Sequence, residues 1–248
     1  MGEHELPAGV KNVSVPTIAG RIILAVILGF LLTAVESVFR MSVFNPEMPA
    51  FANPWIAEAL TTAAMIVIAV LVIAAIGRGR LTFYGFTAGR NIPYSQLITI
   101  SLLFAVPAAV INVFIPGEGL TFMDDKSLLY IIVFAWIGRS VLEEVIHRGL
   151  VQTLMWPLVG LGINIGKIRL SLTVLVSGIF FGLLHLMLLS MGTAPARVIV
   201  IVVFAISLGL IAGYYREKTG SLVPAILVHA LFNISGTVVG LITGALNL

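Results

Sequence analysis

The sequence predicts an all-α, polytopic membrane helix bundle of seven to eight transmembrane helices with an intramembrane polar cavity. Of its 248 residues, 59% are hydrophobic and only 10% are charged, whereas soluble domains carry about 25% charged residues. The mean hydropathy is +1.12. Such a chain cannot cover a water-facing surface with polar side chains. We therefore expect a single integral membrane domain, residues 1–248, with the lipid bilayer as its surroundings.

Seven apolar stretches are long enough to cross a bilayer, which takes ~20 residues of α-helix. They are Ile18–Val38, Trp55–Ile76, Leu97–Ile115, Leu128–His147, Leu170–Leu189, Val198–Tyr215 and the stretch from Leu222 to the C-terminus. The last stretch is either one long helix or two short helices separated near Ser235-Gly236, which would give the eighth. Small residues recur four apart and predict close helix packing, at Gly178/Gly182, Gly209/Gly213 and Gly236/Gly240/Gly244.

Charged residues in the loops predict the orientation of the chain, because cytoplasmic loops carry an excess of Lys and Arg. The basic residues before or at the start of the first span, and after the second, fourth and sixth spans, lie on one side. They include Lys11, Arg21, Arg78, Arg80, Lys167 and Lys218. We therefore expect a cytoplasmic N-terminus. The basic residues are scattered rather than clustered, which argues against a nucleic-acid partner. The absence of cysteine excludes disulfides, thiolate metal sites and a cysteine nucleophile.

One stretch, Val141–Leu150, holds four ionisable side chains at the end of the fourth apolar run: Glu143, Glu144, His147 and Arg148. Each costs ~2.5–3.5 kcal/mol in a membrane even on lenient scales, so a function is the default hypothesis. Residues four apart share a helix face. Glu144 should therefore meet Arg148, and Glu143 should meet His147. The pairing of Glu144 with Arg148 leaves Glu143 as the freer carboxylate, although Arg139, one turn earlier, is placed to neutralise it.

Three further polar side chains lie in later spans: His185, and His229 with Asn233 one helical turn after it. A lone intramembrane histidine is either a hydrogen-bonded core residue or part of a polar cavity. His229 and Asn233 either bind each other or jointly stabilise an oxyanion. Glu36 and Glu58 lie near the ends of predicted helices, where they can reach the interface, and we assign them no role.

Together these residues supply one carboxylate, two imidazoles and one carboxamide from three helices. A glutamate can act as a general base on water with help from a histidine. A second histidine and an asparagine can stabilise the oxyanion of a tetrahedral intermediate. The residue types are therefore those of a hydrolase that needs no serine nucleophile.

Three motifs carry a family resemblance when they are taken in order: Glu143-Glu144-x-x-x-Arg148, Phe181-x-x-x-His185 and His229-x-x-x-Asn233. They resemble the family of CAAX prenyl endopeptidases and bacteriocin-processing membrane proteases, also called CPBP or Abi. The resemblance runs from about Leu128 to Asn233, so we expect a catalytic core at about 128–235. It implies an eight-helix intramembrane bundle with a conical cavity that opens towards the cytoplasm and the lipid.

The resemblance also implies roles for the residues. Glu143 would activate water with His185 as its partner, and His229 and Asn233 would form the oxyanion site. Glu144 and Arg148 would be supporting residues that orient the site.

The implied activity is an intramembrane endopeptidase that removes a C-terminal tripeptide from a prenylated CAAX protein, or cleaves a related membrane-bound peptide. One position departs from the family pattern. His147 stands where an aromatic residue is usual, and it is either an interfacial bystander, which we prefer, or an extra proton carrier beside Glu143.

Three alternatives remain. A metal-dependent protease would bind zinc through Glu143, His185 and His229, but no His-Glu-x-x-His motif is present, so we expect no metal and no other cofactor. A non-catalytic peptide-binding or immunity protein would not need all four polar residues. A transporter would distribute its charges along a path and show repeated halves, and neither is visible in the sequence.

Overall fold

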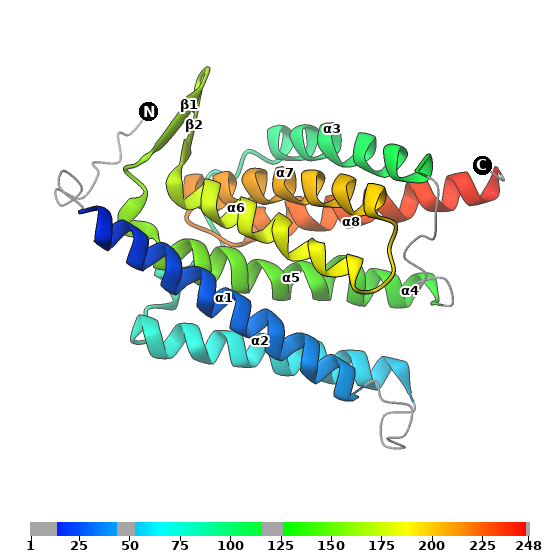
Figure 1. The fold of residues 1–248 in the computed structure, drawn as a ribbon, viewed down its shortest axis with the longest axis horizontal. Coiled ribbons are helices and arrows are strands. Elements are labelled where there is room, and N and C mark those ends of the chain that lie inside the picture. The colour runs from blue at the N-terminus through cyan, green and yellow to red at the C-terminus, as the bar shows by residue number, and fades with distance from the viewer. Residues whose placement is uncertain (1–13, 44–52, 116–125, 247–248) are drawn as a thin grey trace.

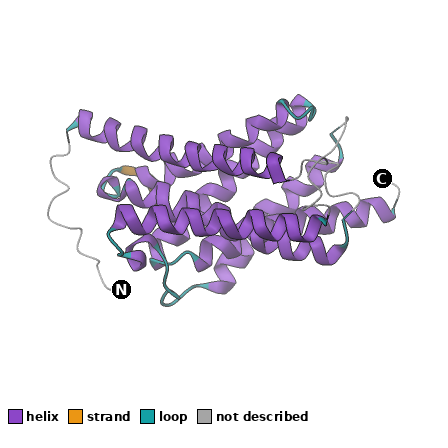
Figure 2. Cartoon of the chain, turned by 90° about the horizontal axis from the view of Figure 1, so that it is seen from below, coloured by secondary structure: helices purple, strands orange, loops and turns teal. Residues whose placement is uncertain are grey.

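The computed structural model describes residues 14–43, 53–115 and 126–246, and most of this part of the chain is helical (Figure 2). The prediction of an all-α membrane bundle is confirmed. Six described helices are long and apolar enough to cross a membrane. They are α1 (Val15–Val43), α2 (Pro54–Gly77), α3 (Tyr94–Val113), α6 (Leu172–Leu184) with its extension η8 (His185–Leu189), α7 (Pro195–Thr219) and α8 (Val223–Ala245). The last span is thus one helix, not two.

The boundaries of these helices follow from local sequence. Asn53 caps α2 by accepting a hydrogen bond from the backbone of Trp55, and Pro54 occupies the first turn, where a missing N–H costs nothing. At the C-terminal end of α7, Gly220 has φ 72°, a conformation that favours glycine and ends the helix. Lys11, whose charge contributes to the predicted orientation, lies outside the described residues.

The fourth predicted span forms one continuous helical path, which we call the central helix. It consists of α4 (Leu128–Tyr130), the π-helical η5 (Ile131–Gly138), α5 (Arg139–Glu144) and the π-helical η6 (Val145–Gln152). Because of the π-helical segments it is not among the six helices above, and the predicted number of seven to eight stays a prediction. Helices α1 and α2 contact the central helix on one side, and α6 and α8 contact it on the other (Figure 1).

Glycine pairs bring α6 and α7 together as predicted. A Cβ added to Gly178 would lie 3.1 Å from the carbonyl carbon of Gly209, and one added to Gly182 would lie 2.8 Å from the backbone nitrogen of Ile206. The prediction is wrong for the third series. No described atom lies within 4 Å of a Cβ built at Gly236, Gly240 or Gly244, so these glycines are not at a tight helix contact.

A hairpin that the sequence reading did not predict precedes α6. Strands β1 (Gly162–Ile165) and β2 (Ile168–Ser171) pair antiparallel, and Gly166 supplies the positive φ of 59° that the tight turn needs. Ser171 then caps α6 by accepting a hydrogen bond from the backbone of Val174. The helix of the fifth span therefore begins at Leu172, two residues after the start of the apolar stretch. A short 3-10 turn, η7 (Trp156–Leu158), joins the central helix to this hairpin.

Candidate active site

The two adjacent glutamates of the central helix point to different partners, because neighbouring side chains lie ~100° apart around a helix axis. Oε1 of Glu143 lies 2.8 Å from Nη2 of Arg139. Oε1 of Glu144 lies 3.1 Å from Nη1 of Arg148. The ion pair expected between Glu144 and Arg148 is therefore formed, and Arg139 pairs with Glu143 as its spacing allowed.

His229 of α8 lies between both carboxylates. Its Nδ1 is 2.8 Å from Oε1 of Glu144, and its Nε2 is 3.8 Å from Oε2 of Glu143. An ionised carboxylate only accepts hydrogen bonds, so Nδ1–H donates to Glu144. This bond fixes the orientation of the ring and directs Nε2 towards Glu143. Glu144 thus holds a histidine in place, a role that could not be read from helix spacing.

Arg148 completes a fully buried polar unit with Glu144. Both side chains are inaccessible to solvent, and the guanidinium carbon of Arg148 lies 4.7 Å from the centroid of the Phe181 ring. Gly209 of α7 leaves room for the guanidinium, because a Cβ there would lie 2.9 Å from Nη2 of Arg148. Removing one partner of such a pair strands the other charge, at a cost of about 3–5 kcal/mol.

The aromatic ring of Phe181 connects the histidines of the three motifs. Its centroid lies 5.0 Å from that of His147, 5.2 Å from that of His185 and 5.5 Å from that of His229, all in edge-on arrangements. His185 also binds the Phe181 carbonyl oxygen through Nδ1, at 3.1 Å. The ring therefore packs His185 and His229 into one neighbourhood.

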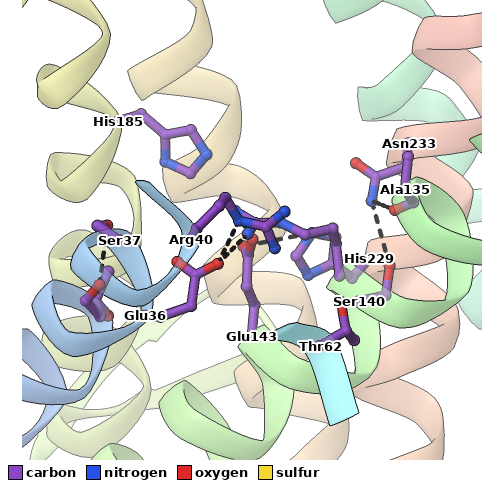
Figure 3. A network of polar contacts seen from close by, with 12 residues as sticks. Glu36, Ser37, Arg40, Thr62, Ala135, Ser140, Glu143, His185, His229 and Asn233 are labelled. Carbon is purple, nitrogen blue, oxygen red and sulfur yellow. Dashed lines mark hydrogen bonds and ion pairs between the residues drawn. The ribbon is translucent and has the colours of Figure 1, made fainter. Parts of the chain in front are cut away.

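Glu143 and His185, which we expect to act together on water, do not contact each other directly in this structure. Among the described residues, no hydrogen bond or ion pair joins them, and Figure 3 shows the His185 ring apart from Glu143. His147 is only 2% exposed and packs against Phe180 and Phe181. It is therefore buried within the protein, and the expectation of an interfacial position was wrong.

Asn233 of α8 binds the central helix rather than His229. Its Nδ2 donates to the carbonyl oxygen of Ala135 at 3.0 Å and to Oγ of Ser140 at 3.3 Å (Figure 3). The π-helical segment makes the first bond possible. The backbone N–H of Arg139 bonds to the carbonyl of Phe134, one residue further back than in an α-helix, and this leaves the Ala135 carbonyl for Asn233.

A chain of alternating charges reaches Glu143 from the first two helices (Figure 3). Arg40 of α1 lies 2.5 Å from Oε2 of Glu58 on α2 and 2.8 Å from Oε1 of Glu36. The same oxygen of Glu36 lies 2.7 Å from Nη1 of Arg139, whose other terminal nitrogen binds Glu143. Both Glu36 and Glu58 are buried, so the expectation that they reach the interface was wrong. Glu36 and Arg40 are four residues apart in the sequence, and this spacing could have predicted their ion pair.

An apolar groove of about 210 Å³ runs beside Asn233, between α3, α7 and α8. Small and aromatic side chains form most of its wall. The lining residues include Ala105, Ala108, Ala109, Phe204, Phe232 and Gly236. The groove therefore joins a polar side chain of the site to a surface suited to hydrocarbon.

The donors proposed for zinc are not arranged as a metal site. Across residues 14–43, 53–115 and 126–246, no three His, Asp or Glu side chains converge as ligands of a metal ion would. Instead, Glu143 and His229 are already engaged with Arg139 and Glu144.

Part of the chain matches a known protein family. Residues 125–235 match the family model described as type II CAAX prenyl endopeptidase, Rce1-like. The matched region contains the central helix and all three motifs, but not α1 and α2. No curated protein and no solved structure matches the chain.

Proposed function

We propose that this chain is a glutamate-type intramembrane endopeptidase, and the match of residues 125–235 to the Rce1-like type II CAAX prenyl endopeptidase family model supports this proposal. Its substrate would be a prenylated CAAX protein, from which it removes the C-terminal tripeptide, or a related membrane-bound peptide. The family is one of proteases, and the apolar helices make the chain an integral, multi-pass membrane protein. The mechanism and the substrate are our proposal.

One observation carries this proposal: a glutamate and a histidine face each other inside the bundle, and each is oriented by a further charged group. Glu143 is held by Arg139, and His229 is held by Glu144. The gap of 3.8 Å between Oε2 of Glu143 and Nε2 of His229 brings a general base next to a group that can polarise a carbonyl. A general base must lie within reach of the proton that it removes. The flanking charges of Arg139 and Glu144 hold Glu143 and His229 in such positions.

In the proposed reaction, the Glu143 carboxylate takes a proton from water. The resulting hydroxide attacks the scissile carbonyl carbon to give a tetrahedral intermediate. When the C–N bond breaks, the proton passes from Glu143 to the leaving amine, so the products are a carboxylic acid and an amine and Glu143 is regenerated. His185, whose Nδ1 is occupied by the Phe181 carbonyl, presents Nε2 as the assisting group.

The oxyanion of the intermediate would be stabilised by His229 and Asn233. His229 donates from Nε2 only when it carries both ring protons, since Nδ1–H is already given to Glu144. The carboxylates of Glu143 and Glu144 offset the positive charge of that imidazolium. Asn233 would exchange its longer bond, to Ser140, for the oxyanion and keep the bond to Ala135.

The groove beside Asn233 supports a substrate with a hydrocarbon chain. Its wall of alanine and phenylalanine side chains matches an apolar ligand in polarity. A chain bound there would place an attached peptide next to the proposed oxyanion site.

Cleavage of defined peptides tests this function. The purified protein, reconstituted in lipid vesicles, is incubated with a farnesylated CAAX peptide, with the same peptide lacking the prenyl group, and with an unrelated transmembrane peptide. We expect loss of the terminal tripeptide from the farnesylated peptide, detected by mass spectrometry. His185→Ala, His229→Ala and Asn233→Ala should each reduce the rate. Cleavage of only the transmembrane peptide would refute the substrate class, and full activity of all three variants would refute the site.

A further inference from the structure

The charged chain formed by Glu58, Arg40, Glu36 and Arg139 ends at Glu143, and its first three members lie outside the region that matches the family. We propose that Glu36, supported by Arg40 and Glu58, is a positioning residue that holds Arg139 against Glu143 and sets the pH range in which Glu143 acts as a base. This inference rests on the proposed function, because it assigns Glu143 the role of base.

Arg139 connects the charged residues of α1 and α2 to Glu143 in the active site. Its Nη1 lies 2.7 Å from Glu36 on α1, and its Nη2 lies 2.8 Å from Glu143 on its own helix. A planar guanidinium that uses one terminal nitrogen for each carboxylate has little freedom to rotate. Glu36 therefore fixes the direction from which Arg139 approaches Glu143, and it also shares the positive charge.

Glu36 is fixed in turn from the opposite side. Its Oε1 accepts from Arg40 as well as from Arg139, and Arg40 reaches across to Glu58 on α2. Thr62 donates to the other oxygen of Glu58 at 3.3 Å. The anchoring thus extends over α1 and α2, so both helices contribute to the geometry at Glu143.

The charges of the linked residues alternate in sign, so the proposal predicts the direction of each substitution's effect on Glu143. From Glu58 to Glu143 the formal charges are negative, positive, negative, positive and negative. In a medium of low dielectric constant each charge acts over several ångströms. Loss of a cation should make Glu143 easier to protonate, and loss of an anion should make it harder, with an effect that decreases along the chain.

Other charged or titratable groups also face Glu143 and stay constant in these comparisons. They are His229 on α8, His185 at the end of α6, and His147 and Arg148 on the central helix. The predicted shift in the protonation of Glu143 should alternate in direction only for substitutions at Glu58, Arg40, Glu36 and Arg139.

The experiment measures kcat/KM against pH for cleavage of the farnesylated peptide, because the acid limb of this profile reports protonation of the base in the free enzyme. We expect Arg139→Gln to move the acid limb to higher pH by about 1 unit or more. Glu36→Gln should move it to lower pH, Arg40→Gln to higher pH by less than Arg139→Gln, and Glu58→Gln to lower pH by the smallest amount. Arg139→Lys, which keeps the charge but cannot offer a separate guanidinium nitrogen to each carboxylate, should move the limb less than Arg139→Gln does.

Two controls separate this from a packing effect. In Glu36→Gln the amide oxygen still accepts hydrogen bonds from both arginines, so a purely structural role predicts no displacement of the limb. Arg21→Gln removes a cation from the same helix but outside the charged chain, and should leave the limb unchanged. If Glu36→Gln and Arg139→Gln leave the limb in place, or move it in the same direction, the inference is wrong.

A further variant distinguishes this failure from failure of the proposed function. Glu143→Gln should be inactive at every pH. If it is inactive while the network variants do not move the limb, the function stands and the positioning role is refuted. If it remains active, Glu143 is not the base, and both proposals fall together.

Discussion

Nδ1 of His229 lies 2.8 Å from Oε1 of Glu144, a contact between side chains 85 residues apart in the sequence. The contact gives the second glutamate of the pair a specific task. Glu144 receives the imidazole on one side and Arg148 on the other, so it orients a group of the site while its own charge is compensated.

Replacing Glu144 by Gln should therefore impair both activity and stability. The variant leaves Arg148 buried without its counter-ion, which costs about 3–5 kcal/mol, and it weakens the hold on the His229 ring, which should lower kcat by roughly 10²-fold or more. The double variant Glu144→Gln/Arg148→Met removes the stranded charge. Thermal unfolding in detergent should show recovered stability, while the cleavage assay should still show low kcat. Recovery of kcat together with stability would show that Glu144 has only a structural role.

Asn233 should matter far more than its partner Ser140. If Asn233 donates to the oxyanion, Asn233→Ala should lower kcat by roughly 10²–10³-fold, as for other oxyanion donors. Ser140→Ala removes only the acceptor that Asn233 is proposed to release, so its kcat should stay close to that of the wild type. Steady-state cleavage of the farnesylated peptide measures both variants. Equal losses in the two would indicate that the Asn233–Ser140 bond itself, rather than a free Asn233 donor, is required.

A side chain introduced at Gly236 should block the groove beside Asn233. No described atom lies within 4 Å of a Cβ at this position, and leucine is a better helix former than glycine, so Gly236→Leu should fold normally. It should raise KM for the farnesylated peptide. Gly240→Leu, one turn later and not in the groove wall, is the matched control and should resemble the wild type. If both variants keep the wild-type KM, the hydrocarbon chain does not bind in this groove.

The orientation of the protein in the membrane can be measured by labelling single introduced cysteines, because the chain has no cysteine of its own. Lys167 lies in the turn of the hairpin before α6, and Ser190 follows η8 at the other end of that span. Both are exposed, so single variants Lys167→Cys and Ser190→Cys should fold. In intact cells, a membrane-impermeant maleimide should label Ser190→Cys only, because we predict that Lys167 faces the cytoplasm. The reverse pattern would invert the predicted topology and place the N-terminus outside.

The sequence predicted some of the interactions within one helix. Spacing of four residues predicted the contact of Glu144 with Arg148 and allowed that of Arg139 with Glu143, and both are present. The apolar runs predicted the membrane helices for the same reason, since hydropathy depends on local composition alone.

Contacts between helices were beyond this reasoning. Glu36 and Arg139 are 103 residues apart, and helix spacing says nothing about which side chains of other helices complete a charge. The π-helical register that gives Asn233 access to the Ala135 carbonyl has no simple sequence pattern either. Glu36 and Glu58 were consequently dismissed as interfacial, although the packing of α1 and α2 buries them.

The most direct test of the central claim compares peptide turnover by the wild-type protein, with and without a metal chelator, with turnover by Glu143→Gln. Wild-type protein in vesicles should cleave the farnesylated peptide at the same rate with and without the chelator, because water is activated by the glutamate. Glu143→Gln should bind the peptide with an affinity close to that of the wild type and show no cleavage above the uncatalysed rate. Measurable turnover by Glu143→Gln, or loss of wild-type activity on chelation, would contradict a metal-independent glutamate mechanism.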